Sequence, residues 1–123
     1  MFNNLALVFI GGGLGSVLRF LITRFMTSRF EYGLPISTLS VNVIGSLLLG
    51  LFIGFAHKNN WGESQYLILF TVGFCGGFTT FSTFSYENII LLKQGDYLMT
   101  ILYTTLSLGL GLSAAFLGIE LSK

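Results

Sequence analysis

The residues best suited to chemistry lie together in one segment, GFCGGFTTFSTFSY, which runs from Gly73 to Tyr86. It combines glycines, hydroxyl side chains and phenylalanines, without a charged residue, inside a long apolar run. Threonine hydroxyls can form hydrogen bonds with the backbone, and these bonds compete with those of a helix. Irregular backbone at membrane depth is tolerated only where it is buried in protein or lines a water-filled site. The segment therefore predicts a broken membrane helix that borders such a site.

Hydroxyl and amide side chains also recur at one-turn spacing on the other apolar runs. The members are Thr38, Asn42 and Ser46, then Tyr103 and Ser107, with Thr79, Thr80, Ser82 and Thr83 in the interrupted segment itself. Residues one turn apart share a helix face. Such stripes either bond neighbouring helices to one another or replace the water around a small anion. The spacing alone leaves both interpretations open.

Aromatic rings and one arginine complete the set of candidate residues. Phe78, Phe81 and Phe84 are three residues apart and therefore lie on one helix face. An aromatic stripe usually packs in a core, although the electropositive edge of a ring can also face an anion. Arg19 lies in the second half of an apolar run. It either extends its side chain to the membrane boundary or serves a water-filled vestibule.

The apolar runs lack the usual residues of catalysis. They contain no Ser/His/Asp set, no paired carboxylates and no His or Cys spacing typical of a metal site, and the single His57 lies at the end of a run. We therefore expect that the protein is not an enzyme. Neutral donors and one arginine, without a central carboxylate, favour the passage of an anion over that of a cation.

The composition defines the elements that must position these residues. The chain has 123 residues, of which 53% are hydrophobic and 9% are charged, and its mean hydropathy is +0.81. Such a chain is too apolar for a soluble domain of this size, which predicts an integral membrane protein. Each crossing needs about 20 apolar residues. We expect one all-α domain over residues 1–123, with four membrane spans at about 5–26, 38–57, 66–92 and 97–121.

The charges give little indication of a partner or an orientation. The net charge is +1 and the chain has no basic cluster, which argues against binding of nucleic acid. Near the ends of the predicted spans, one side carries two Lys or Arg residues and the other three. This difference is too small for the positive-inside rule to select an orientation. We therefore expect the chain to insert into the lipid bilayer both ways up.

Three motifs together resemble the Fluc, or CrcB, family of fluoride channels. They are GGGLGSVLRF from Gly11, TLSVNVIGS from Thr38 and GFCGGFTTFSTFS from Gly73, and the last is the most specific. The resemblance extends over nearly the whole chain. It implies a passive fluoride channel of the bacterial inner membrane that lowers cytoplasmic fluoride and protects against its toxicity. It also implies an antiparallel, dual-topology homodimer with two fluoride pores.

The resemblance assigns roles to individual residues. Backbone carbonyls of Gly76 and Thr79 in each subunit hold a structural sodium ion, which is not transported, at the centre of the dimer. The fluoride pathway comprises Asn42, Phe81, Ser82, Thr83, Phe84, Tyr103 and Ser107. Arg19 matches an arginine near the vestibule, and Glu87 matches an acidic position that fits either the vestibule or the membrane boundary. The polar track of the fourth span departs from the family pattern after Ser107, where Gly111 and Ala115 follow.

Two other classes of protein fit some of these observations. A small dual-topology exporter of the multidrug type has a similar size, but it needs a membrane-embedded carboxylate in its first span, and residues 5–26 contain none. A structural or assembly subunit would use the same glycines and hydroxyls only to pack helices. Substitution of Asn42 by Asp or of Phe81 by Ile separates this class from a channel, because a channel would still assemble but would conduct poorly.

Overall fold

The computed structural model of the chain is all-helical and describes residues 1–29, 33–62 and 64–123. Its helical segments are α1 (Phe2–Arg29), α2 (Ile36–Lys58), α3 (Gln65–Leu67), η1 (Ile68–Cys75), α4 (Gly76–Phe78), α5 (Phe81–Lys93) and α6 (Tyr97–Ser122). The segments α3, η1 and α4 follow one another without a gap, and α5 begins after a short break. Within the described residues, four helices are long and apolar enough to cross a membrane, with α3 to α5 counted as one. This confirms the prediction of an all-helical, multi-pass membrane protein whose third span is interrupted.

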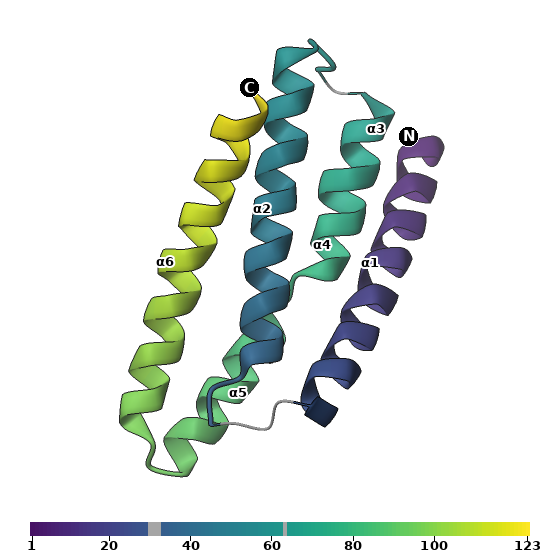
Figure 1. Cartoon of the computed structure of the whole chain (residues 1–123). Helices are drawn as coiled ribbons and strands as arrows, with labels where there is room; N and C mark the ends of the chain where they lie inside the picture. The colour runs from purple at the N-terminus through teal and green to yellow at the C-terminus, as the bar shows by residue number, and fades with distance from the viewer. Residues whose placement is uncertain (30–32, 63) are drawn as a thin grey trace.

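Successive spans run in opposite directions, so that both termini lie at the same end of the molecule (Figure 1). Polar side chains cap the N-terminal ends of two of the spans. Ser64 accepts a hydrogen bond from the Leu67 N–H, and Asp96 accepts one from the Met99 N–H. Gly95, just before the last span, adopts a positive φ of 77° that favours glycine in the tight turn. These caps set where the third and fourth spans start.

The first half of the third span packs against α1 through glycines on both helices. A Cβ atom added at Gly15 would clash with the Phe74 carbonyl oxygen, and one added at Gly77 would clash with that of Gly12. Gly11 and Gly73 likewise bring backbone against backbone. Small residues permit this close approach of helices in a membrane. Part of this half is a π-helix, Ile68–Cys75, which the sequence pattern did not predict.

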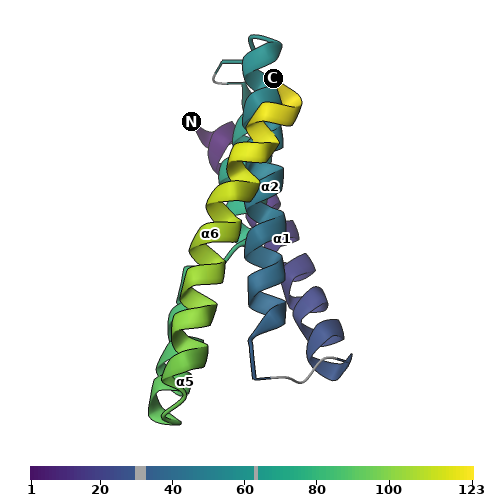
Figure 2. The ribbon, with the colours of Figure 1, turned by 60° about the vertical axis from the view of Figure 1, so that its left-hand side comes forward.

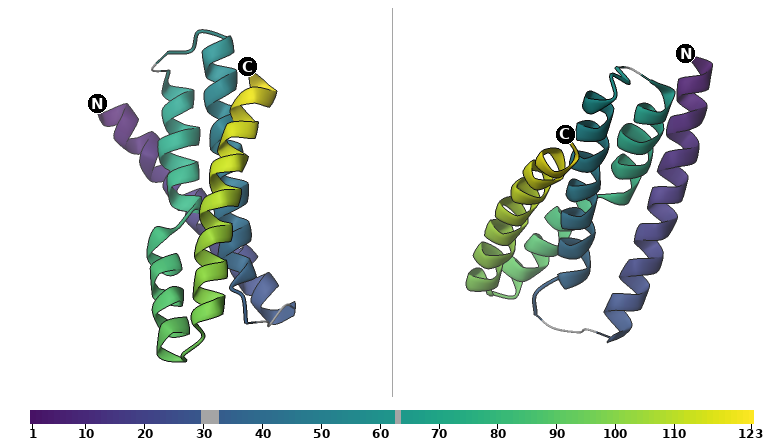
Figure 3. Two further views of the ribbon diagram at one scale, coloured as in Figure 1. Left: turned by 90° about the vertical axis from the view of Figure 1, so that its left-hand side faces the viewer. Right: turned by 45° about the horizontal axis from the view of Figure 1, so that its top comes forward.

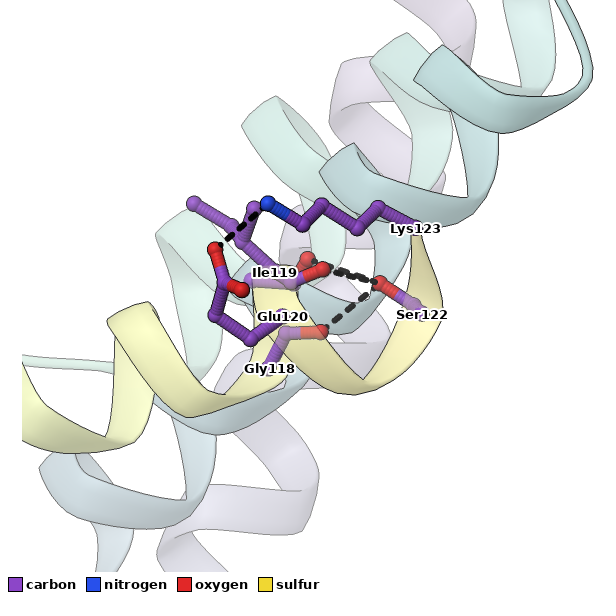
Figure 4. Close-up of polar contacts among 6 residues, drawn as sticks. Gly118, Ile119, Glu120, Ser122 and Lys123 are labelled. Carbon is purple, nitrogen blue, oxygen red and sulfur yellow. Dashed lines mark hydrogen bonds and ion pairs between the residues drawn. The ribbon is translucent and has the colours of Figure 1, made fainter.

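A second close contact joins α2 to α6 along much of their length (Figures 1 and 3). Added Cβ atoms at Gly50 and Gly118 would each meet backbone of the opposite helix. At the end of α6 the Ser122 hydroxyl lies 2.7 Å from the Gly118 carbonyl (Figure 4). It also lies 3.5 Å from the Gly50 carbonyl of α2. The molecule therefore contains two helix pairs with close backbone contact: α1 with the first half of the third span, and α2 with α6.

The two halves of the third span lie beside different helices. The half from Gln65 to Phe78 lies beside α1, whereas α5 lies beside α6 (Figures 1 and 3). Seen from the side, α5 and α6 diverge from the lower part of α1 (Figure 2). The break at Thr79 and Thr80 spans the change of direction and lies near the middle of the bundle.

Candidate functional site

The break in the third span consists of two residues with extended backbone. Thr79 has φ −81° and ψ 159°, and Thr80 has φ −148° and ψ 122°. The Thr79 N–H and the Thr79 hydroxyl both donate to the Cys75 carbonyl, at 3.0 and 2.9 Å. These bonds end the first half of the span, and the chain then leaves the helix.

The side chain of Asn42 on α2 pairs with the backbone of Thr80. The Thr80 N–H donates to Asn42 Oδ1 at 2.8 Å, and Asn42 Nδ2 donates to the Thr80 carbonyl at 3.0 Å. The amide thus satisfies both backbone groups of a residue that has left the helix, as burial in a membrane requires. Because Asn42 Nδ2 carries two hydrogens, one of them remains available to a ligand.

Thr80 also starts the second half of the span. Its hydroxyl accepts a hydrogen bond from the Thr83 N–H at 3.2 Å, the usual bond of a helix N-cap. The same hydroxyl lies 3.1 Å from the Thr83 hydroxyl and 3.3 Å from that of Ser82. Thr80 therefore links the two halves, a role that was not predicted from its place among the hydroxyl donors of the segment. An N-cap threonine before the apolar residues of α5 was the signal that could have identified it.

These bonds occupy the N–H groups that two backbone carbonyls would bind in a continuous helix. In a continuous helix the Gly76 carbonyl would accept from the Thr80 N–H, and the Thr79 carbonyl from the Thr83 N–H. Here the first donor binds Asn42 and the second binds the Thr80 hydroxyl. Gly76 is also exposed on the surface of the chain. Both carbonyls predicted to hold sodium have thus lost their helical donors to other acceptors.

A cavity of about 370 Å³ opens beside the break. Its described lining residues are Asn42, Gly45, Ser46, Leu49, Thr71, Cys75, Gly76, Thr79, Thr80, Phe81, Phe84, Ser107, Leu108 and Gly111. They come from α2, from both halves of the third span and from α6, and none of them is charged. The structure thus brings six of the predicted site residues to one cavity: Asn42, Gly76, Thr79, Phe81, Phe84 and Ser107.

The lining combines neutral donors with aromatic rings. Ser107 Oγ is buried and has no hydrogen-bond partner among the described residues. The rings of Phe81 and Phe84 lie with centroids 5.8 Å apart and planes tilted by 42°, and Phe81 is 77% exposed in the single chain. Donors and ring edges of this kind can bind a small anion without a fixed positive charge that would trap it.

Comparison with known proteins identifies the family. The family model described as CrcB-like protein, Camphor Resistance (CrcB), matches residues 6–119. The chain belongs to the CrcB family. A protein named fluoride-specific ion channel FluC in Gloeothece citriformis is 52% identical over 120 residues, which are 98% of this chain and 97% of that protein. Proteins of the same name in Flavobacterium psychrophilum and Azobacteroides pseudotrichonymphae are 46% and 41% identical over 93% and 100% of this chain, and over 92% and 98% of their own lengths.

In this CrcB chain a smaller hollow of about 100 Å³ also borders the break. Its described lining residues are Arg19, Phe20, Thr23, Thr38, Val41, Thr80 and Thr83. Two predicted site residues, Arg19 and Thr83, therefore meet here rather than in the larger cavity. Thr80 borders both spaces. The Ser82 hydroxyl lies near that of Thr80, and Ser82 is exposed.

The structure does not bring Tyr103 or Glu87 to the larger cavity of this CrcB chain. Tyr103 is fully buried and its hydroxyl donates to Glu87 Oε1 at 3.0 Å, which joins α6 to α5. Its ring packs in a cluster with Leu39 and Leu91 and lies 5.0 Å from that of Phe84. Within the single chain, Tyr103 thus supports a residue of the lining. A place for Tyr103 in the pathway and one for Glu87 in the vestibule stay predictions.

Arg19 makes a contact that the sequence analysis did not predict. Its Nε donates to the Gly77 carbonyl of α4 at 3.1 Å, and the Ser16 hydroxyl donates to the same oxygen at 3.3 Å. The sequence allowed two roles for Arg19, with its side chain either extended to the membrane boundary or placed in a water-filled vestibule. Neither role includes a hydrogen bond to the helix break. No motif in the sequence pairs these residues, because they are separated by most of two spans and meet only after α1 packs on α4.

Proposed function

We propose that this protein is a fluoride-selective, passive ion channel of the cell membrane that exports fluoride from the cytoplasm. Fluoride would enter a cell as neutral HF, dissociate inside and leave through the channel as the ion. The proposal is supported by membership of the CrcB family and by relatives named fluoride-specific ion channels. The observation that carries it is the uncharged cavity at the helix break, with hydroxyl and amide donors and two phenylalanine rings.

Fluoride is small and strongly hydrated, so a pathway must replace its water with other donors. Asn42 Nδ2 retains one hydrogen after bonding Thr80, and the Ser107 hydroxyl has no partner among the described residues. The edges of Phe81 and Phe84 add positive potential without a charge. The hydroxyls of Ser82 and Thr83 would extend these donors toward the smaller hollow.

We further propose that two copies assemble in opposite orientations around the break. In the single chain Gly76 and the Phe81 ring are exposed, so the candidate site is open on one side. The nearly even distribution of Lys and Arg permits insertion both ways up. An antiparallel copy would cover the open side and would bring a second set of break carbonyls to the symmetry axis.

The residues at the break fit a structural sodium ion at this axis. A hard cation prefers oxygen ligands, and the donors that would occupy the Gly76 and Thr79 carbonyls in a helix are bound elsewhere. Two carbonyls from each copy would therefore hold the ion. The ion would supply positive charge that keeps four carbonyl dipoles together, and it would not be transported.

Flux measurements with purified protein in liposomes test this function. In a potassium gradient with valinomycin, we expect rapid fluoride efflux recorded by a fluoride electrode and retention of chloride recorded by a chloride electrode. Equal efflux of both anions would refute selectivity. Proton-coupled release of an organic cation, without fluoride efflux, would instead identify the multidrug-type exporter, which needs a carboxylate that α1 lacks.

A further inference from the structure

Arg19 is directed to the helix break rather than to the membrane boundary. It lies in the second half of α1 and donates through Nε to the Gly77 carbonyl at 3.1 Å. Ser16, three residues earlier on the same helix, donates to that oxygen at 3.3 Å. Residues three apart share a helix face, so two donors of α1 converge on one carbonyl of α4.

The Gly77 carbonyl needs such donors because the helix ends immediately after it. In a continuous helix it would accept from the N–H of Phe81, but the extended backbone of Thr79 and Thr80 separates the two residues. Carbonyls of a last helical turn are left without internal partners. Inside a membrane an unsatisfied carbonyl is unfavourable by several kcal/mol. Arg19 and Ser16 take the place of the missing helical donor.

The charge of Arg19 also suits this location. A cation is stabilised near the C-terminal end of a helix, where carbonyl dipoles point outward. The ion pair found among the described residues joins Lys123 to Glu120 at the far end of α6, and no carboxylate of the described chain pairs with Arg19. The partner that the structure provides for the guanidinium is therefore the end of α4.

This contact lies between the two carbonyls proposed to hold sodium. Gly76 precedes Gly77, and Thr79 follows it by two residues. Gly77 itself lies so close to α1 that an added Cβ would clash with the Gly12 carbonyl oxygen. A peptide group held by two hydrogen-bond donors and by close backbone packing, all from α1, has little freedom to rotate. Its neighbours in the same turn are then fixed in direction as well.

We propose that Arg19 is a positioning residue of the sodium site. By binding the Gly77 carbonyl it fixes the last turn of α4, and so aims the carbonyls of Gly76 and Thr79 at the ion. This inference rests on the proposed function, because it assumes the sodium ion at the break. It differs from a vestibule role, in which the guanidinium would attract fluoride and would not affect sodium.

Thermal unfolding in detergent at increasing sodium concentration measures the effect of Arg19 on sodium binding without recording flux. An organic cation keeps the ionic strength constant. A ligand that binds only the folded state stabilises it by RT ln(1 + [L]/Kd), so the dependence of the Tm on sodium concentration gives the Kd for sodium. We expect R19Q to raise this Kd about tenfold over that of the wild type, as when groups that orient metal ligands are removed. S16A should raise the Kd by a smaller factor. R24Q is the matched control, since Arg24 lies on the same helix over the Phe20 ring, 5.7 Å from its centroid.

The outcomes distinguish this inference from the proposed function. An unchanged Kd for sodium in both R19Q and S16A would overturn the inference, even if R19Q lowered fluoride efflux at every sodium concentration. Absence of any sodium effect on the wild-type Tm would overturn it together with the sodium site. Absence of fluoride efflux from the wild type would refute the channel, while the Kd values for sodium would still decide the role of Arg19. If R19Q yields no folded protein, the Kd of S16A gives the decision.

Discussion

The two halves of the third span are held in the molecule by different means. The half that ends at Phe78 contacts α1 through backbone, because glycines on both helices leave no room for a Cβ between them. The half that begins at Phe81 is held by side chains, chiefly the cluster of Leu39, Leu91 and Tyr103 and the hydrogen bond from Tyr103 to Glu87. One span therefore contains a part with rigid backbone and a part with side-chain packing.

This difference corresponds to what each half contributes to the site. The first half contributes backbone, namely the Gly76 carbonyl and the end of the helix, whose direction depends on the backbone being fixed. The second half contributes the rings of Phe81 and Phe84, which can adjust by rotation about side-chain bonds. We infer that substitutions in the first half should affect assembly of the site as a whole. Substitutions in the second half should change it more locally.

The strongest test of the comparison is G77A. The added methyl would meet the oxygen, Cα and carbonyl carbon of Gly12, none of which can move unless α1 separates from α4. We expect the free energy of unfolding to fall by about 3 kcal/mol, well beyond the roughly 1 kcal/mol that alanine gains over glycine in a helix. Fluoride efflux should be lost with the fold. Thermal unfolding in detergent and flux in liposomes measure the two effects.

G13A provides the control for this substitution. Gly13 lies on α1 beside Gly12, but a Cβ added there would meet nothing within 4 Å. We therefore expect G13A to be at least as stable as the wild type. If G77A proved equally stable, the first half of the span could not be in backbone contact with α1, and the contrast between the two halves would disappear.

An intermediate effect is expected from N42D, which acts at the junction of the halves. Aspartate can still accept from the Thr80 N–H, as Asn42 Oδ1 does at 2.8 Å, but it loses the donor to the Thr80 carbonyl. Repulsion between a carboxylate and an anion about 4 Å away amounts to roughly 4 kcal/mol at an effective dielectric constant of about 20. We expect a folded protein whose fluoride efflux is reduced more than tenfold, measured in liposomes.

N59D is the matched control, because it makes the same exchange away from the break. Asn59 Nδ2 also donates to a backbone carbonyl, that of Phe55 at 2.8 Å, but it does so at the exposed end of α2. The same atoms are exchanged far from the break, so efflux should remain at the wild-type rate. Undiminished efflux from N42D would show that the anion does not pass Asn42.

The fold could be predicted from the sequence because it follows from local properties. Four apolar runs of sufficient length determine four spans, and the glycines and threonines after Gly73 indicate where the third is interrupted. The π-helix of Ile68–Cys75 was not predictable in this way. Its residues are as apolar as those of an ordinary membrane helix. The hydrophobic pattern does not show whether backbone hydrogen bonds join residues five apart, as in a π-helix, or four apart, as in an α-helix.

The site could be predicted only where residue type determines the role. Asn42, Phe81, Phe84 and Ser107 were selected as donors or rings, and the structure gathers them at one cavity. The partners were not predictable. Asn42 bonds the backbone of Thr80, and Arg19 bonds that of Gly77. Backbone acceptors carry no signal in the sequence, because every residue has one and only the tertiary structure shows which of them lacks a helical donor.

The smallest effect is expected from Y103F, which tests whether the second half of the span is held by packing alone. The substitution removes the hydroxyl that donates to Glu87 and keeps the ring that lies 5.0 Å from that of Phe84. Hydrogen bonds between membrane helices contribute about 0.6 kcal/mol on average. We therefore expect a loss of stability of about 1 kcal/mol or less and a change in efflux of less than about threefold. Y97F, in which an exposed tyrosine at the start of α6 loses its hydroxyl, is the control.

The opposite result from Y103F would change the interpretation of α6. A tenfold loss of efflux at unchanged Tm would mean that fluoride uses the Tyr103 hydroxyl, as the resemblance to the family implies. Since that hydroxyl is buried against Glu87 in the single chain, the bond would then have to open in the assembled channel. The second half of the span would be a moving part rather than a packed one. The contrast with the first half would be greater, because a backbone held by Gly12, Ser16 and Arg19 has no comparable freedom.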